Sequence, residues 1–188
     1  MDRGEGVKSI TMLIRELTKA DAGNYLGLRL QSEEEFPEFV GFNAERELGA
    51  GQSGLAALLA AYASEGTVVW GAFEDNHLLG VVVLSRRLSP KYRHKAFLWG
   101  MYVVPEFRGT GLAQTLMQHT LAWANAHPEL VAVSLQVTVS NTRGQKFYQR
   151  FGFSIFGTEQ RSLLAAGQFH AVHYMGLELK TTNQHVPS

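Results

Sequence analysis

A glycine-rich turn between a strand and a helix constrains the fold of this chain more than any other feature. Residues 101–113 read Met-Tyr-Val-Val-Pro-Glu-Phe-Arg-Gly-Thr-Gly-Leu-Ala, so an apolar strand passes through Gly109 and Gly111 into a helix. Small residues let the backbone approach a ligand, and the first N–H groups of a helix have no partner within it. These donors and the helix dipole favour an anion, and Arg108 adds a positive charge. The turn therefore predicts a phosphate site.

Two common phosphate-binding turns do not fit this segment. A nucleotide-hydrolysing P-loop needs Gly, four residues, Gly-Lys and then Ser or Thr, and the sequence has no such run. In the dinucleotide fingerprint Gly-x-Gly-x-x-Gly, the third glycine would fall at Gln114, whose side chain would obstruct close packing of helix on strand. The pattern that is left is Arg108-x-x-Gly111-x-Ala113, preceded by Val-x-Pro.

The sequence after the turn predicts three more strands, with a helix between the first and the second. Apolar residues alternate along 131–139, which is the period of a strand with one buried face. Asn141 follows this strand, and Gly152 ends the next helical segment in the manner of a left-handed cap. A strand beginning at Phe153 and a closing strand over His170–Leu179 complete the pattern.

These segments together resemble the GNAT-type N-acetyltransferase superfamily, which binds acetyl-coenzyme A. The Arg-x-x-Gly-x-Ala turn is similar to the pyrophosphate loop of that family. Asn141 to Phe153 resembles the family's Asn-x-x-x-x-x-Phe-Tyr-x-x-x-Gly-Phe signature. The resemblance covers residues 67–179 well and the N-terminal third only by general pattern. It implies acetyl-coenzyme A as cosubstrate and no metal.

The order of elements predicts an α+β fold with a mixed, largely antiparallel sheet flanked by helices. Two of its strands, Ala96–Val104 and 131–139, are joined by a helix and should run parallel. In the resembled fold this pair splays apart at its C-terminal ends. The other expected elements are a strand over 11–17, a helix from Thr18 or Asp21 to Gln31, a helix over Gly54–Ser64, strands over Val68–Phe73 and Leu78–Leu84, and a helix from Leu112 to His127-Pro128.

Length and composition predict one domain without a membrane span. A chain of 188 residues can bury roughly 70% of its unfolded surface. We expect the domain to cover residues 11–180, between a flexible leader at 1–10 and a flexible tail at 181–188. The longest apolar run, Leu55–Ala63, is too short to cross a bilayer.

Charge and cysteine content narrow the partners and the compartment. Lys and Arg total 17, as do Asp and Glu, so no basic field draws the chain to nucleic acid or to a membrane. The absence of cysteine is compatible with a reducing cytoplasm, and the seven histidines lack the spacing of a metal site. We expect a cytoplasmic monomer or homodimer that meets an amine acceptor whose identity the sequence leaves open.

The resemblance implies which residues hold the cofactor. In the splayed pair of strands, backbone groups of Met101 to Val104 are free to hydrogen-bond the pantetheine arm, and the turn takes the pyrophosphate. The expected cofactor-binding residues are Met101, Tyr102, Val103, Val104, Arg108, Gly109, Thr110, Gly111, Leu112, Ala113, Asn141 and Tyr148.

The resemblance also implies roles in catalysis. The backbone N–H of Val103 would polarise the thioester carbonyl as an oxyanion donor, and Tyr148 would act as general acid toward the departing sulfur. Asn141 would orient the cofactor. Because no cysteine can carry an acyl intermediate, direct transfer to a primary amine of a small molecule, peptide or protein is expected. The alternative from a different class is a sensor or interaction module that binds acyl-coenzyme A without turnover.

The general base is left unassigned. At pH 7 about one lysine-type amine in 2,500 is neutral, against about one α-amino group in ten, so the need for a base depends on the acceptor. The candidates are Glu33, Glu34, Glu35, Glu38, Glu106 and His94.

The final hairpin departs from the family pattern. Related enzymes often carry an acidic pair shortly before the methionine of this hairpin. Here the segment reads His-Ala-Val-His-Tyr-Met over 170–175, so an ammonium that relies on that pair would lose its partner.

Overall fold

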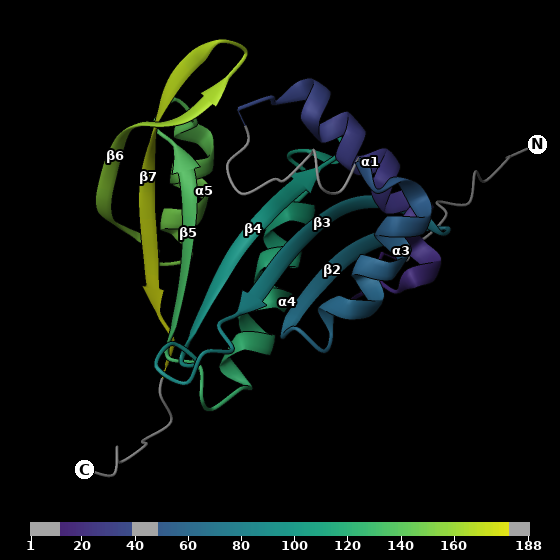
Figure 1. The fold of residues 1–188 in the computed structure, drawn as a ribbon, viewed down its shortest axis with the longest axis horizontal. Coiled ribbons are helices and arrows are strands. Elements are labelled where there is room, and N and C mark those ends of the chain that lie inside the picture. The colour runs from purple at the N-terminus through teal and green to yellow at the C-terminus, as the bar shows by residue number, and fades with distance from the viewer. Residues whose placement is uncertain (1–11, 39–48, 181–188) are drawn as a thin grey trace, which may run out of the picture.

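One mixed sheet of seven strands forms the centre of the molecule in the computed structural model, which describes residues 12–38 and 49–180 (Figure 1). The strand order is β1-β2-β3-β4-β5-β7-β6, and only β4 and β5 pair in parallel. The predicted α+β class is therefore confirmed. The strands are β1 Leu13–Glu16, β2 Thr67–Glu74, β3 His77–Arg86, β4 Lys95–Val103, β5 Ala132–Thr138, β6 Ser154–Ala165 and β7 Gln168–Glu178.

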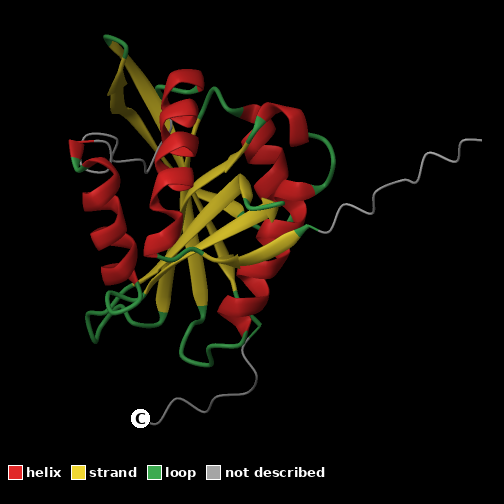
Figure 2. Cartoon of the chain, turned by 90° about the vertical axis from the view of Figure 1, so that its right-hand side faces the viewer, coloured by secondary structure: helices red, strands yellow, loops and turns green. Residues whose placement is uncertain are grey.

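Helices cover both faces of this sheet (Figure 2). On one face, apolar residues of α1 and α3 pack on Val69, Val81 and Val83. On the other face, α4 packs on Val82 and Leu84 in a larger core, which the aromatic side of α5 extends. The sheet therefore separates two cores, as alternating side chains on a buried sheet require. The helices are α1 Ala22–Glu35, α3 Gly51–Tyr62, α4 Leu112–Asn125 and α5 Thr142–Arg150.

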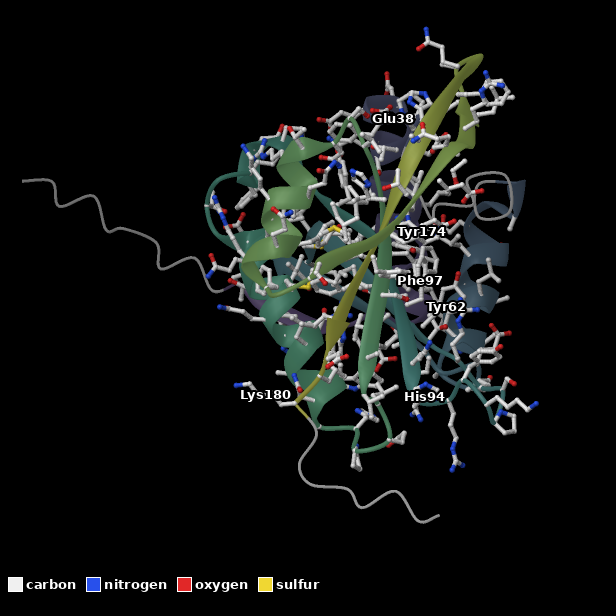
Figure 3. All side chains as sticks on the ribbon, turned by 90° about the vertical axis from the view of Figure 1, so that its left-hand side faces the viewer. Glu38, Tyr62, His94, Phe97, Tyr174 and Lys180 are labelled. Atoms are coloured by element: carbon white, nitrogen blue, oxygen red, sulfur yellow. The ribbon has the colours of Figure 1, made fainter. Side chains whose placement is uncertain are left out.

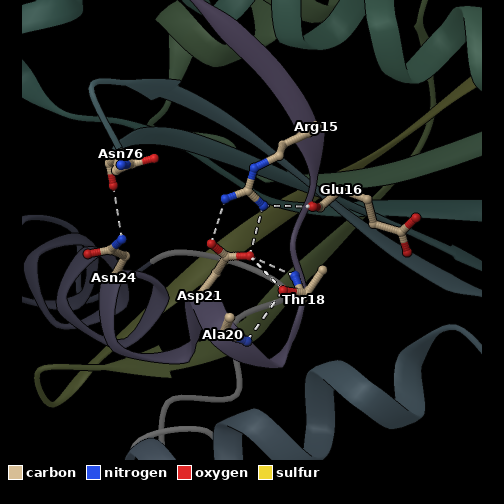
Figure 4. Close-up of polar contacts among 7 residues, drawn as sticks. All are labelled: Arg15, Glu16, Thr18, Ala20, Asp21, Asn24 and Asn76. Carbon is tan, nitrogen blue, oxygen red and sulfur yellow. Dashed lines mark hydrogen bonds and ion pairs between the residues drawn. The ribbon is translucent and has the colours of Figure 1, made fainter.

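The first helix begins at a polar anchor that the sequence predicted in part. Thr18 and Asp21 form a capping box around a short 3-10 turn, which leads directly into α1. Arg15 donates to both carboxylate oxygens of Asp21, at 2.8 and 2.7 Å (Figure 4). The helix ends at Glu35 and not at Gln31, because the first residues unsuited to a helix are Phe36 and Pro37.

Strands β2 and β3 form the predicted hairpin around Asp75 and Asn76. Both turn residues have positive φ, 45° and 68°, which matches the twist that a tight hairpin needs. Asn24 of α1 donates to the Asn76 carbonyl at 3.1 Å, so this turn is tied to the first helix.

The parallel pair β4–β5 separates part-way along its length. Pairing covers only Lys95–Leu98 against 132–135. Beyond that point β4 continues to Val103 along β3, and β5 continues to Thr138 along β7. The two strands diverge toward the top of Figure 1. The predicted splayed parallel pair is confirmed.

The last two strands form a long hairpin at the edge of the sheet (Figure 1). Its outer strand β6 shifts register twice against β7 and carries Arg161 at φ 54°. Large apolar side chains are exposed on both strands of the hairpin, such as Phe156 of β6 and Phe169 of β7. The predicted leader and tail at residues 1–10 and 181–188 lie outside the described residues.

Candidate active site

The turn after β4 presents a row of unpaired donors. Gly109 and Gly111 have φ 81° and 93°, a conformation that glycine adopts without strain. Among the described residues, no N–H from Gly109 to Gln114 finds a backbone or side-chain acceptor. No heavy atom lies within 4 Å of a Cβ built on either glycine, so the space above the turn is open. The geometry suits the oxygens of a phosphate.

Three cations of α5 face the same space, and the sequence analysis did not assign them. Arg143, Lys146 and Arg150 line a cavity of about 510 Å³ together with Gly109 and Gly111. Positions i, i+3 and i+7 lie along one helix face, so the spacing alone could have grouped them. Nothing in the sequence indicates that this helix face points toward the glycine-rich turn.

Arg108 also lines that cavity, but its guanidinium is hydrogen-bonded to α1. Its Nε donates to the Val103 carbonyl at 2.9 Å, and its two terminal nitrogens donate to the Glu35 carboxylate, Nη2 at 2.5 Å. The Tyr102 hydroxyl donates to the same carboxylate at 2.8 Å. Arg108, followed by Tyr102, holds the pKa of Glu35 below its usual value. The charge expected at the pyrophosphate is thus engaged with Glu35.

The backbone of β4 offers fewer free groups to the gap than expected. The N–H of Val104 donates to the Leu79 carbonyl at 2.9 Å, and its carbonyl accepts from Phe107 at 3.1 Å. Val104 therefore differs from the expectation, because neither of its polar groups is free. The backbone N–H and C=O groups of successive strand residues point to opposite edges of the strand. Those of Tyr102, which pairs with Val81, therefore also point toward β3, and those of Met101 and Val103 point toward the gap.

Tyr148 lies at the edge of the gap. It lines one cavity of about 210 Å³ with Met101 and Val103. It also lines a second cavity of about 260 Å³ with Glu38 and Asn141. Burial raises the pKa of Tyr148 above its usual value, so the phenol stays protonated at neutral pH and can donate.

Asn141 has a structural role that the sequence analysis did not assign. Its Oδ1 accepts from the Gly144 N–H at 2.8 Å and caps α5. A Cβ at Gly144 would lie only 2.8–2.9 Å from the Asn141 side chain, so the glycine allows this cap. The amide of Asn141 also lines both cavities beside Tyr148.

The structure separates the candidates for the general base. Glu38 alone of them lines the cavity that holds Tyr148. Glu35 forms an ion pair with Arg108. Glu33 and Glu34 belong to the last turn of α1; burial raises the pKa of Glu33, and Glu34 is exposed. His94 lies at the opposite end of the molecule from Glu38 (Figure 3). The remaining candidate, Glu106, is exposed on the short 3-10 turn Pro105–Phe107.

A carboxylate of the final hairpin lies beside Tyr174, although the segment over 170–175 has no acidic residue. The Tyr174 hydroxyl of β7 donates to Glu159 of β6, and the Ser162 hydroxyl donates to Glu159 at 2.9 Å. These bonds, Tyr174 first, lower the pKa of Glu159. The acidic group beside Tyr174 is therefore supplied by the outer strand.

Comparison with known proteins decides the family. Residues 31–153 match the model of the acetyltransferase (GNAT) family, which is more than half of the chain. This chain belongs to the GNAT acetyltransferase family. Within the described residues, no group of three His, Asp or Glu side chains could hold a metal ion, and no helix there is long and apolar enough to cross a membrane.

Individual GNAT relatives agree in sequence over part of the chain and in fold over most of it. The L-amino acid N-acetyltransferase AaaT of Escherichia coli (strain K12) is 26% identical over 101 residues, which cover 54% of this chain and 62% of that protein. A GNAT-family acetyltransferase from Streptococcus pneumoniae superposes with a TM-score of 0.79 at 24% identity, covering 90% of this chain and 99% of the other. The yncA structure from Salmonella typhimurium, determined with its cofactor acetyl-CoA, has a TM-score of 0.79 at 17% identity, covering 95% and 98%.

Proposed function

We propose that this protein is an acetyl-coenzyme A-dependent N-acetyltransferase that transfers the acetyl group directly to a primary amine. One observation carries the proposal: the gap between β4 and β5 ends on the open turn at 109–114 and has Tyr148 at its edge. Family membership and the acetyl-CoA bound to the yncA structure support it. Cytoplasmic location and a monomeric or homodimeric state stay predictions.

The cofactor would be held in two parts. The unpaired N–H groups of 109–114 and the cations Arg143, Lys146 and Arg150 would hold the phosphates, because charge-assisted hydrogen bonds to phosphate are the strong ones. Backbone groups of Met101 and Val103 would hold the pantetheine arm in the gap. Arg108 would join the phosphates only by leaving Glu35.

The chain's own groups account for the chemistry. Bound acetyl-coenzyme A supplies a thioester, whose C–S bond breaks as the amine forms a C–N bond. The N–H of Val103 faces the gap and would polarise the carbonyl. Tyr148, kept protonated by burial, would give its proton to the sulfur, and Glu38 would accept the proton of the amine directly or through water.

We propose that the acceptor presents an α-amino group, as a free amino acid does. The E. coli relative carries the name L-amino acid N-acetyltransferase. An α-amino group is less basic than a lysine-type amine and is therefore more often neutral at pH 7, so a single carboxylate such as Glu38 suffices as base. No second carboxylate lines the cavity around Glu38 and Tyr148 among the described residues, so that cavity gives no added support to a strongly basic lysine or polyamine.

A thiol-trapping assay across a panel of amines tests this function. We expect steady release of coenzyme A with L-amino acids and slower release with polyamines and with peptides whose only amine is a lysine. Tight binding of acetyl-coenzyme A in calorimetry, without thiol release from any amine, would favour the sensor instead. Absence of binding to coenzyme A in either form would contradict both.

A further inference from the structure

A charged side chain lies fully inside the core between α1 and the sheet. Arg29 is 1% exposed and is among the largest fully buried side chains of the described residues. Burying a guanidinium is costly unless its hydrogen bonds and charge are satisfied. A leucine at this position of α1 would fill the core without that cost. The position therefore calls for an explanation beyond packing.

The guanidinium of Arg29 reaches the strand that borders the gap. Its Nη1 donates to the Gly100 carbonyl of β4 at 3.3 Å, and its Nη2 donates to the Tyr25 hydroxyl at 2.6 Å. The Arg29 Cζ atom also lies 5.5 Å from the ring centroid of Trp99, the residue before Gly100. Arg29 thus contacts two successive residues of β4 from the side opposite to α4.

Gly100 is the residue at which β4 changes course. It has φ 61°, which an ordinary strand residue does not adopt, and the β3–β4 register shifts opposite it, between Val81 and Val83. A Cβ on Gly100 would lie 2.4 Å from Arg29 Nη2, so the glycine also makes room for the guanidinium. The last β4 residue paired with β5, Leu98, lies just before this bulge.

We propose that Arg29 is a positioning residue that fixes the Gly100 bulge and thereby aims the backbone of Met101 and Val103 into the gap. Arg29 itself touches neither cofactor nor acceptor and acts through Gly100. The bulge decides which groups of β4 face β3 and which face the gap, since one extra residue reverses the alternation. This inference rests on the proposed function, because it assigns those groups to the pantetheine arm.

Two ligands that differ by the pantetheine arm separate this role from a purely structural one. Coenzyme A needs both the turn and the gap, whereas its 3′-phosphorylated ADP half needs only the turn and the α5 cations. In Arg29→Met we expect calorimetry to show about tenfold weaker binding of coenzyme A, the size of one lost hydrogen-bonded contact, with binding of the ADP half unchanged. Equal effects on both ligands, or no effect on either, would overturn the proposal.

Control variants keep the test independent of stability. Leu28→Ala removes buried volume from the same helix, so it should lower the melting temperature without changing the ratio of the two affinities. Gly100→Ala should reproduce the Arg29→Met effect, and the double variant should be no worse than either single one. Additive losses in the double variant would contradict a shared role.

A milder substitution covers the case in which Arg29→Met does not fold. Lysine cannot reproduce the fork that reaches Gly100 and Tyr25 together, so Arg29→Lys should give a smaller loss of the same selective kind. An Arg29→Lys variant that matches the wild type for both ligands would overturn the proposal. If the wild type itself does not bind coenzyme A, the proposed function fails, and not the role of Arg29 alone.

Discussion

The two halves of β4 are both largely apolar, but only the first half pairs with β5. Over 95–98 the strands pair in parallel and belong to the core. From Gly100 onward the same strand pairs only with β3, and the groups on its other side are left for a ligand. An exposed sheet edge normally favours aggregation, because its unpaired N–H and C=O groups can bind a strand of another chain. Here that property, confined to the far half of one strand, makes the candidate site.

The largest effect expected at the open end is the loss of the Tyr148 hydroxyl. Tyr148→Phe keeps the ring that packs against Phe153 but removes the proton donor, so kcat should fall about 10²-fold while KM for acetyl-coenzyme A changes little. Steady-state thiol release measures both constants. Tyr92→Phe, which alters an exposed tyrosine in the β3–β4 loop, is the control. A kcat within a factor of about two of the wild type would remove Tyr148 from the mechanism.

The next effect concerns proton removal from the acceptor. Glu38→Gln should lower kcat about 10²-fold for a lysine-type amine and about tenfold for an α-amino group, because fewer molecules of the former are neutral. Parallel assays with the two amines measure the difference. Glu34→Gln, at an exposed position of α1, should leave both rates unchanged. Equal losses for the two amines would show that Glu38 does not act as the base.

A smaller effect is expected for the basic face of α5. Replacing Arg143, Lys146 or Arg150 by Gln removes a charge-assisted contact worth about 1.5–3 kcal/mol, so each variant should bind coenzyme A at least about tenfold more weakly. Calorimetry at two salt concentrations should show a weaker salt dependence than the wild type. Arg87→Gln, at an exposed position just after β3, is the control. Unchanged affinity in all three would place the phosphates elsewhere.

The smallest effect belongs to the ion pair between Glu35 of α1 and Arg108 of the turn after β4. Arg108, more than Tyr102, lowers the pKa of Glu35 below its usual 4.5, so this pair stabilises the fold above that pH and loses its contribution as the pH falls toward the lower folded value. Both side chains are partly exposed, so the contribution is only about 0.5 kcal/mol. Glu35→Gln should therefore lower the melting temperature by a few degrees at most, at pH 7 and not at pH 3.

The same variant sharpens the account of Arg108. Without the Glu35 carboxylate, Arg108 is free to reach the phosphates, so Glu35→Gln should bind coenzyme A as well as or better than the wild type. Glu16→Gln, at an exposed position of β1, should change neither affinity nor melting temperature. Weaker binding by Glu35→Gln would mean that the pair holds Arg108 where the cofactor needs it.

Local patterns were enough to predict most of the fold. Several elements depend only on the conformational preferences of residues a few positions apart, which the sequence shows directly. They are the hairpin at Asp75 and Asn76, the turn at Gly109 and Gly111, and the helix that ends before Gly152. The parallel pair followed from a helical connection between two strands. The extent of α1 was missed because Glu33 to Glu35 are compatible with a helix end and with a helix interior alike.

The sequence by itself determined the strand–turn–helix unit and the resemblance that points to acetyl transfer. Only the tertiary structure decided which groups of that unit are free. Glu35 meets Arg108 across 73 positions, and Arg29 meets Gly100 across 71, so no local pattern could pair them. The same holds for the basic face of α5, whose direction depends on how the helix packs. Contacts between distant segments are set by the packing of whole elements, and they decide where each charge at this site points.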